Sequence, residues 1–217
     1  MLEKDILKDV IDELKKELDS TTLVAVSKTK PNEDILKVYD LGIRDFGENY
    51  VQELVTKMDT LPKDIKWHMI GHLQTNKVKE LVKRNIYLIE SVDSIKLVQT
   101  INKEATRNNK IVNILIEVNI ANDVNKTGCN IKDLNDLINE TKGLSNINLL
   151  GLMAIAPHTD DITEIRNSFR KMNELKKKYE LQLLSMGMSD DYQIAIEEGT
   201  DIVRIGSKIF GERIYKK

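Results

Sequence analysis

A single lysine at the end of an apolar run is the first residue that could do chemistry. The run "LVAVSK" has apolar residues at 23–26, followed by Ser27 and Lys28. An ammonium group at this position must reach solvent or meet a specific partner, because burying it alone is costly. When it is deprotonated, a lysine amine can form a Schiff base with an aldehyde. Lys28 is therefore a candidate nucleophile, and a solvated strand-end lysine is the alternative.

Two later segments combine glycine with serine. They read "LSMGMSDD" (184–191) and "RIGSKIFG" (204–211). Glycine lets backbone N–H groups approach an anion closely, and serine adds a hydroxyl donor. The two segments therefore predict a phosphate site. The alternative is that Gly187 and Gly206 only turn the chain and that Ser189 caps a helix.

The elements that must position these residues alternate along the chain. Short apolar runs predict strands, and segments of helical spacing lie between them. The eight runs are 23–28, 43–49, 67–71, 87–92, 111–120, 149–156, 183–189 and 201–207. Strands that alternate with helices indicate a parallel sheet, and eight such units predict a single-domain (β/α)8 TIM barrel of the α/β class. A doubly wound open sheet is the alternative, but no G-x-G-x-x-G follows the first run.

The helical segments have recognisable ends and spacing. The segment that begins at Asn32 is predicted to use this residue as its N-cap, and Gly42 and Gly199 are predicted helix ends. The N-terminal segment predicts an amphipathic helix. Its apolar residues at helical spacing are Leu2, Ile6, Val10, Leu14 and Leu18.

The expected barrel places the lysine and the two Gly/Ser segments at one site. The carboxyl ends of the strands form the active face, and phosphate sites commonly use the loops after strands seven and eight. Pyridoxal 5'-phosphate (PLP) carries both an aldehyde, for Lys28, and a phosphate, for those loops. Arg204 would then lie near the ring nitrogen. Because an arginine stays protonated, it would donate to that nitrogen and weaken the ring as an electron sink.

Composition and charge limit the classes of function. The 217 residues include 33 Lys and Arg and 35 Asp and Glu, and this balance argues against a nucleic-acid-binding protein. The single cysteine, Cys129, excludes an intramolecular disulfide and fits a reducing compartment. The N-terminus does not resemble a signal peptide, and no apolar run approaches the roughly 20 residues that span a bilayer. We expect a soluble cytoplasmic protein with one domain, residues 1–217, and no membrane partner.

The histidines do not predict a metal site. His68 and His72 flank "MIG" in the third run, but a zinc ion needs further ligands, and no cluster of His, Cys or Asp is evident in the sequence. We therefore expect His68 to be a hydrogen-bonded residue of the third strand, and we expect no metal.

Five ordered motifs resemble those of the pyridoxal phosphate homeostasis protein family, once called proline synthetase co-transcribed homologues. The motifs are "VAVSKTKP", "DFGENYVQE", "WHMIGHLQTNK", "GLMAIAP" and "LSMGMSDDYQIAIEEGTDIVRIGSKIFG", and the resemblance runs over about residues 23–211. It implies a barrel similar to the N-terminal domain of bacterial alanine racemase. The segment "DVNKTGC" departs from the family, because Asn125 stands where a serine is expected before the lysine.

The resemblance also implies the residues that bind PLP. It implies that Lys28 carries the cofactor as an internal aldimine, that Arg204 faces the ring nitrogen and that Asn49 lines the pocket. It further implies phosphate contacts from Ser185 and from residues 206–207. The complete expected set is Lys28, Asn49, Ser185, Arg204, Gly206 and Ser207.

Three functions fit such a site, and we expect the first. The resemblance implies a PLP-binding protein of intracellular PLP homeostasis without catalytic residues or clear turnover. It also implies PLP as the ligand, PLP-dependent apoenzymes as candidate partners and a monomeric state.

The second is an amino-acid racemase, which needs acid/base groups on both faces of the substrate carbanion. In alanine racemase the opposing tyrosine comes from a second domain, which we do not expect here, and Tyr50, Tyr192 and Tyr215 are not at predicted strand ends. The third is a Schiff-base aldolase without a cofactor, but it leaves Arg204 unexplained.

Overall fold

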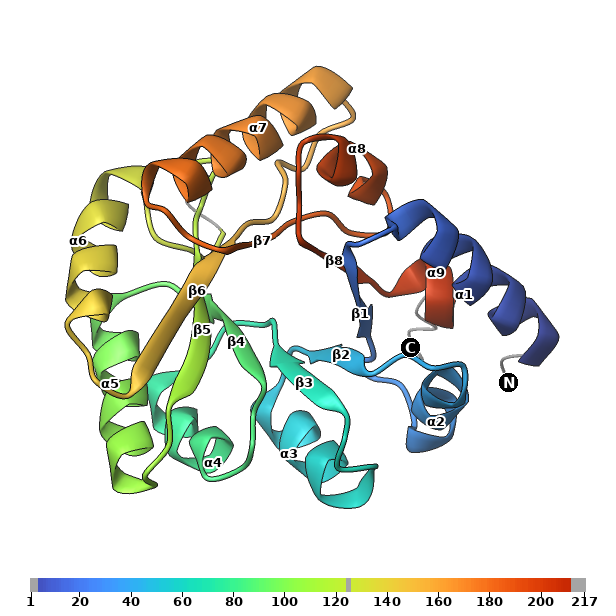
Figure 1. Ribbon diagram of the computed structural model, residues 1–217, viewed down its shortest axis with the longest axis horizontal. Helices are drawn as coiled ribbons and strands as arrows, with labels where there is room; N and C mark the ends of the chain where they lie inside the picture. The colour runs from blue at the N-terminus through green and yellow to red at the C-terminus, as the bar shows by residue number, and fades with distance from the viewer. Residues whose placement is uncertain (1–3, 124–125, 212–217) are drawn as a thin grey trace.

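The protein folds as a closed barrel of eight parallel strands surrounded by helices (Figure 1). The computed structural model describes residues 4–123 and 126–211. Each strand pairs with its neighbours in chain order, and β8 pairs with β1 to close the barrel. The strands are β1 Thr22–Val26, β2 Asp45–Glu48, β3 Lys66–Met69, β4 Leu88–Val92, β5 Val112–Glu117, β6 Ile147–Met153, β7 Leu183–Ser185 and β8 Ile202–Ile205. The predicted (β/α)8 architecture is thus confirmed.

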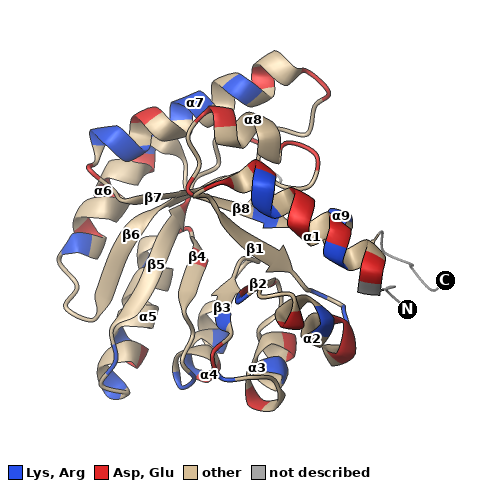
Figure 2. Ribbon diagram, turned by 45° about the vertical axis from the view of Figure 1, so that its right-hand side comes forward, with Lys and Arg blue, Asp and Glu red and all other residues tan. Residues whose placement is uncertain are grey.

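The helices form the outer ring and carry charges of both signs. Figure 2 shows Lys or Arg interspersed with Asp or Glu on α1 and α7, as expected for solvated helix faces. The helices are α1 Lys4–Leu18, α2 Asn32–Asp40, α3 Val51–Thr60, α4 Val78–Val82, α5 Ile95–Arg107, α6 Ile131–Lys142, α7 Ile162–Lys178, α8 Tyr192–Glu197 and α9 Ser207–Phe210, with a 3-10 turn, η1 Thr75–Lys77. Among the described residues, no helix is both long and apolar enough to cross a membrane.

The first helix buries a different set of residues from the one that its sequence suggested. Its buried face consists of Leu7, Ile11, Leu14 and Leu18, whereas Ile6 is 62% exposed. The spacing of 4, 3 and 4 residues keeps these four side chains on one stripe of the helix, and this stripe packs against the main core. Of the expected set, Leu14 and Leu18 are buried, Val10 is half-buried, and Leu2 lies outside the described residues.

Two of the three predicted helix boundaries are confirmed. Gly42 and Gly199 follow α2 and α8 with φ angles of +91° and +84°, in the left-handed region that glycine adopts without strain. The predicted N-cap at Asn32 is wrong. Pro31 occupies that position, and Asn32 is the first residue of α2, where its side chain donates to Thr60 Oγ1 at 3.1 Å.

Alternate strand residues face either the helices or the interior of the barrel, as the period of two requires. In β8, Val203 and Ile205 join the main core under the helices, whereas Ile202 belongs to a separate cluster with residues of four other strands. Arg204 follows Ile202 on the same side of the strand, and it is 4% exposed. The interior therefore has an apolar layer and, toward the carboxyl ends of the strands, a polar one.

Candidate PLP-binding site

A cavity of about 250 Å³ lies at the carboxyl ends of β1 and β8. It is smaller than the roughly 300–1,000 Å³ of pockets for drug-sized ligands, so it suits a compound with one ring. Its lining combines cations, hydroxyls and glycines with a few apolar side chains. These residues are Val26, Lys28, Lys30, Asn49, Ile70, Ile155, Met188, Ser189, Asp190, Arg204, Gly206, Ser207 and Gly211.

The structure brings five of the six expected PLP-binding residues to this cavity. β1 ends at Val26, so Lys28 lies in the turn that follows, half-buried in the cavity wall. β8, which pairs with β1, ends at Ile205, so the next two residues line the cavity at the start of α9. The five residues are Lys28, Asn49, Arg204, Gly206 and Ser207.

Ser185 is the expected residue that the structure places elsewhere. It is the last residue of β7, it is fully buried, and it is not among the residues that line the cavity. Its hydroxyl donates to Glu90 Oε2 at 2.6 Å and accepts from Arg204 Nη1 at 2.5 Å. Both polar functions of this hydroxyl are therefore used inside the barrel.

Ser189 lines the cavity instead; its segment was expected to bind phosphate, with a helix cap as the alternative role for this serine. Helix α8 begins at Tyr192, after Asp191, so Ser189 does not cap it. The Ser189 hydroxyl accepts a hydrogen bond from Gly206 N–H at 3.3 Å, which joins the two Gly/Ser loops. Gly187 makes the turn between Ser185 and Ser189, with a φ angle of +95°. The sequence signal for this difference is position relative to Gly187: Ser185 precedes it and belongs to the strand, whereas Ser189 follows it and belongs to the loop.

Arg204 is held by a chain of buried polar groups. Its Nη2 donates to the carbonyl oxygen of Ala154 at 2.9 Å, while Nη1 donates to Ser185. Burial lowers the pKa of Arg204, and the negative charge of Glu90 opposes this effect. An arginine that keeps its charge is required for donation to a ligand acceptor, and the carboxylate behind Ser185 helps to retain that charge.

The network of buried polar groups extends from Glu90 across the barrel interior to Asp45, the first residue of β2. His68 Nδ1 lies 2.6 Å from Glu90 Oε1, and His68 Nε2 lies 3.1 Å from Asp45 Oδ1. Burial lowers the pKa of His68, but the hydrogen bonds with Asp45 and Glu90 outweigh it and raise the pKa overall. Burial raises the pKa of Glu90, but His68, Arg204 and the hydrogen bond from Ser185 together outweigh that effect and lower the pKa overall. His68 is thus a hydrogen-bonded residue of β3, as predicted. No group of three His, Cys, Asp or Glu side chains within residues 4–123 and 126–211 could hold a metal ion.

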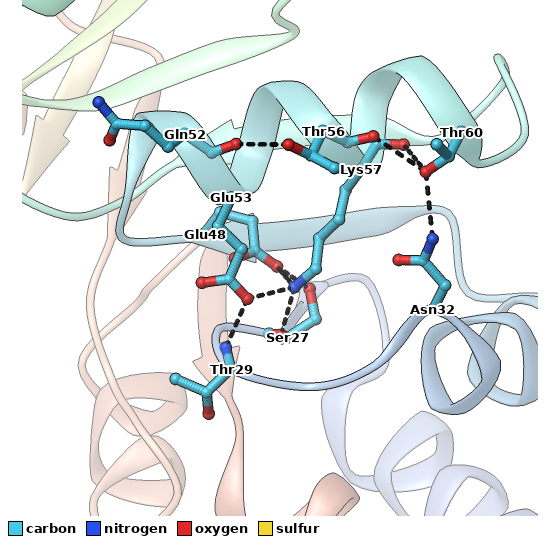
Figure 3. A network of polar contacts seen from close by, with 9 residues as sticks. All are labelled: Ser27, Thr29, Asn32, Glu48, Gln52, Glu53, Thr56, Lys57 and Thr60. Atoms are coloured by element: carbon cyan, nitrogen blue, oxygen red, sulfur yellow. Dashed lines mark hydrogen bonds and ion pairs between the residues drawn. The ribbon is translucent and has the colours of Figure 1, made fainter.

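A second polar network lies behind the turn that carries Lys28 (Figure 3). Lys57 Nζ, from α3, donates to Ser27 O at 2.9 Å, to Glu48 Oε1 at 2.8 Å and to Glu53 Oε1 at 2.6 Å. Burial raises the pKa of Glu48 to about 7, although Lys57 lies beside it. Ser27 and Glu48 were expected only as strand-end residues, and Glu53 and Lys57 were not singled out, because no sequence pattern shows that α3 meets the turn after β1.

The residues at the cavity suit an anionic aromatic aldehyde such as PLP. Lys28 provides an amine and Arg204 provides a cation that is buried in the cavity lining. Ser189 and Ser207 provide hydroxyl donors beside the backbone of Gly206. A Cβ atom added to Gly206 would lie 3.3 Å from Val26 Cβ, so this glycine lets the backbone pass close to β1. The donor set, rather than any one residue, fits the phosphate and aldehyde together.

The fold and the site define the class of the protein. The sequence model of the family "Alanine racemase, N-terminal domain" matches residues 3–214. Within this class, the chain belongs to the pyridoxal phosphate homeostasis protein family. It is 44% identical to the protein of that name from Aquifex aeolicus, over 89% of this chain and 87% of the relative. It is 38% identical to the human protein of that name, over 90% of this chain and 78% of the relative.

Solved structures agree with this assignment. PipY of Synechococcus elongatus, without PLP, is 33% identical and has a TM-score of 0.89, covering 94% of this chain and 100% of PipY. PipY with PLP bound is 31% identical, with a TM-score of 0.86 over the same shares of the two chains. Alanine racemase of Clostridium difficile has a TM-score of 0.80 at 14% identity, covering 98% of this chain and 58% of the racemase. That resemblance shows the shared barrel fold.

Proposed function

We propose that this protein binds PLP through Lys28 and serves PLP homeostasis as a carrier without catalytic turnover. The observation that carries the proposal is the meeting of Lys28 with residues of the two Gly/Ser loops at one cavity. The PLP-bound structure of the relative PipY supports the choice of ligand. In this proposal residues 1–217 form one PLP-binding domain, which acts as a cytoplasmic monomer and has PLP-dependent apoenzymes as partners.

Lys28 supplies the amine that bonds to the cofactor. Its Nζ would form a C=N bond with the aldehyde carbon and release one water. Addition of water would restore the aldehyde and the Lys28 amine, whereas an incoming amine would take over the C=N bond and free Lys28. Release by exchange is what a carrier requires. Asn49 borders the cavity at the end of β2 and limits how the ring can lie.

We assign the phosphate to the loops after β7 and β8, with one change from the expected residues. Ser207 and Gly206 remain phosphate contacts, and Ser189 replaces Ser185 as the donor from the β7 loop. Ser185 instead connects Arg204 to Glu90. Arg204 donates toward the ring nitrogen and keeps it unprotonated, which weakens the carbanion stabilisation that PLP enzymes use.

The racemase alternative is less well supported because Asp190, the acidic side chain in the cavity lining, is exposed to solvent rather than held for proton transfer. Among the described residues that line the cavity there is no tyrosine. Tyr50 is 61% exposed, and the Tyr192 hydroxyl is bonded to Glu17 and Lys208 on the outer face of the barrel. Tyr215 lies outside the described residues, as does Asn125, the position that departs from the family.

The covalent site is tested by reduction with borohydride in the presence of PLP. We expect one pyridoxyl group on Lys28 in the wild-type protein and its loss in Lys28→Ala. Lys30→Ala is the matched control, because Lys30 lines the same cavity with its Nζ bonded to Phe210 O at 2.9 Å. Equal labelling of Lys30 in the Lys28→Ala variant would show that the assignment is wrong.

The carrier and racemase readings are separated in deuterated water. The PLP-loaded protein is incubated with each L-amino acid, and α-proton exchange and chirality are followed by NMR and chiral chromatography. We expect slow or absent exchange, together with passage of PLP to an apoenzyme. Fast exchange that disappears in Lys28→Ala would establish the racemase function instead.

A further inference from the structure

The residue that follows Lys28 has a strained backbone. Thr29 has a φ angle of +66°, in the left-handed region that β-branched residues rarely adopt. Its side chain is exposed, so packing of that side chain does not hold the conformation. Such strain persists only where surrounding contacts fix the backbone, and here it lies next to the proposed covalent residue.

A carboxylate from α3 holds this backbone in place. Thr29 N–H donates to Glu53 Oε1 at 2.6 Å, and the same oxygen accepts from Lys57 Nζ at 2.6 Å. A charged acceptor makes the bond to the amide stronger than one between neutral groups. Figure 3 shows Glu53 between the Thr29 amide and the end of the Lys57 side chain.

Lys57 holds the chain on the other side of Lys28. It is 4% exposed, and its Nζ donates to the carbonyl oxygen of Ser27 at 2.9 Å. Ser27 Oγ donates to Glu48 Oε1 at 2.6 Å, so the Ser27 side chain is fixed as well. The residues immediately before and after Lys28 therefore both bond to the Glu53–Lys57 pair.

A purely helical role does not account for this arrangement. Glu53 and Lys57 are spaced i,i+4 on α3, and such a pair can stabilise a helix on its own at the surface. That role requires neither a buried ammonium nor contacts with a loop more than twenty residues away. Glu53 and Lys57 instead bond to the two backbone groups that flank Lys28, the Thr29 amide and the Ser27 carbonyl oxygen.

We propose that Glu53 is a positioning residue for Lys28, which acts by holding Thr29 in its left-handed conformation and, through Lys57, by holding Ser27. The Glu53–Lys57 pair directs the Lys28 side chain into the cavity before PLP arrives. The inference rests on the proposed function, since it assigns Lys28 as the residue that bonds PLP. It extends that function to the α3 residues that prepare the amine.

The first test examines the cofactor-free protein. In Glu53→Ala, hydrogen exchange of the Thr29 amide should be at least roughly tenfold faster than in wild type, because its charged acceptor is gone. Glu33→Ala is the matched control, since it removes a carboxylate of the same charge from the exposed start of α2. Unchanged exchange at Thr29 in Glu53→Ala would overturn the proposal.

The second test uses PLP itself and a rescue. Glu53→Ala should lower the rate of borohydride-trapped labelling of Lys28 by roughly tenfold. Adding Thr29→Asn should recover much of the rate, because asparagine adopts the left-handed conformation more readily than threonine. If Glu53 served only the stability of α3, the double variant would be as slow as Glu53→Ala, and that result would refute the proposal.

The two tests distinguish a failure of the positioning role of Glu53 from a failure of the proposed function of Lys28. If wild-type protein is not labelled at Lys28, the proposed function is wrong, while amide exchange still reports on the contact between Glu53 and Thr29. If Lys28 is labelled normally in both wild type and Glu53→Ala, the proposed function stands and the positioning role is wrong. Circular dichroism of each variant ensures that altered rates come from folded protein.

Discussion

The carboxyl group of Glu48 should make the stability of the protein depend on pH in a defined direction. Glu48 is fully buried, its Oε1 accepts from Ser27 and Lys57, and its Oε2 has no hydrogen-bond partner in the described part of the chain. Burial raises its pKa to about 7 from the ordinary value of 4.5. Between these two pH values the folded protein retains a proton that the unfolded chain has released. The free energy of unfolding therefore falls as pH rises through this window.

The size of the effect follows from the two pKa values. The difference between about 7 and 4.5, at about 1.4 kcal/mol per pH unit, corresponds to about 3 kcal/mol when the group titrates fully. Glu48→Gln removes the titration while its amide oxygen can still accept from Ser27 and Lys57. The variant should therefore lose up to about 3 kcal/mol of the decline that wild type shows between pH 4.5 and about 7.

Urea unfolding at a series of pH values measures this decline directly. The free energy of unfolding is compared between wild type and Glu48→Gln at each pH, so that titration of all other groups is common to both. Glu33→Gln, on the exposed start of α2, controls for the loss of one carboxylate. Parallel curves for wild type and Glu48→Gln across the window would refute the reasoning, because they would mean that Glu48 has the same pKa folded and unfolded.

Three further predictions concern the phosphate loops and the barrel interior. Ser207→Ala and Ser189→Ala should each weaken PLP binding by about 1–3 kcal/mol in equilibrium dialysis, and unchanged affinity in both would count against the phosphate placement. Gly187→Ala should lower the thermal midpoint, because its φ angle is +95° and a Cβ would come within 2.6 Å of α8. His68→Gln should destabilise the protein by up to roughly 3–5 kcal/mol, because it removes the cation hydrogen-bonded to buried Glu90 and leaves only Arg204, whose Nη1 lies 3.9 Å from Glu90 Oε2. Since the pKa of His68 is raised, this contribution is present below pH 6.5 and is lost as pH rises through the folded pKa; equal losses at low and high pH would contradict it.

The barrel could be predicted because its strands are buried on both faces. Such strands read as short continuous apolar runs, and each of the eight predicted runs overlaps a strand, although β1, β3 and β6 begin one or two residues before the run. Their ends were less well predicted, since polar residues after the last paired residue were included. The α1 face was misassigned because Leu7 and Ile11 are shifted by one position from Ile6 and Val10, and both sets have helical spacing.

The candidate site could be predicted wherever a residue follows a strand directly. Lys28 and residues 206–207 lie just beyond β1 and β8, so their place at the mouth follows from the fold. Ser185 was misplaced because β7 ends at that residue, which makes it an interior strand position. The strained Thr29 and its partner Glu53 could not be found, since no sequence pattern marks a positive φ angle at threonine or a contact between a loop and the next helix.

The two cations proposed to meet PLP share one physical arrangement. Each is supported from behind by hydrogen-bonded polar groups that include a buried charge: Lys28 through Glu53 and buried Lys57, and Arg204 through Ser185 and buried Glu90. Ordering these groups during folding removes a loss of entropy that would otherwise oppose binding. A preorganised site increases affinity for the cofactor, and this effect is separate from the acid/base groups that racemisation needs. The buried networks therefore favour a protein that holds its cofactor firmly.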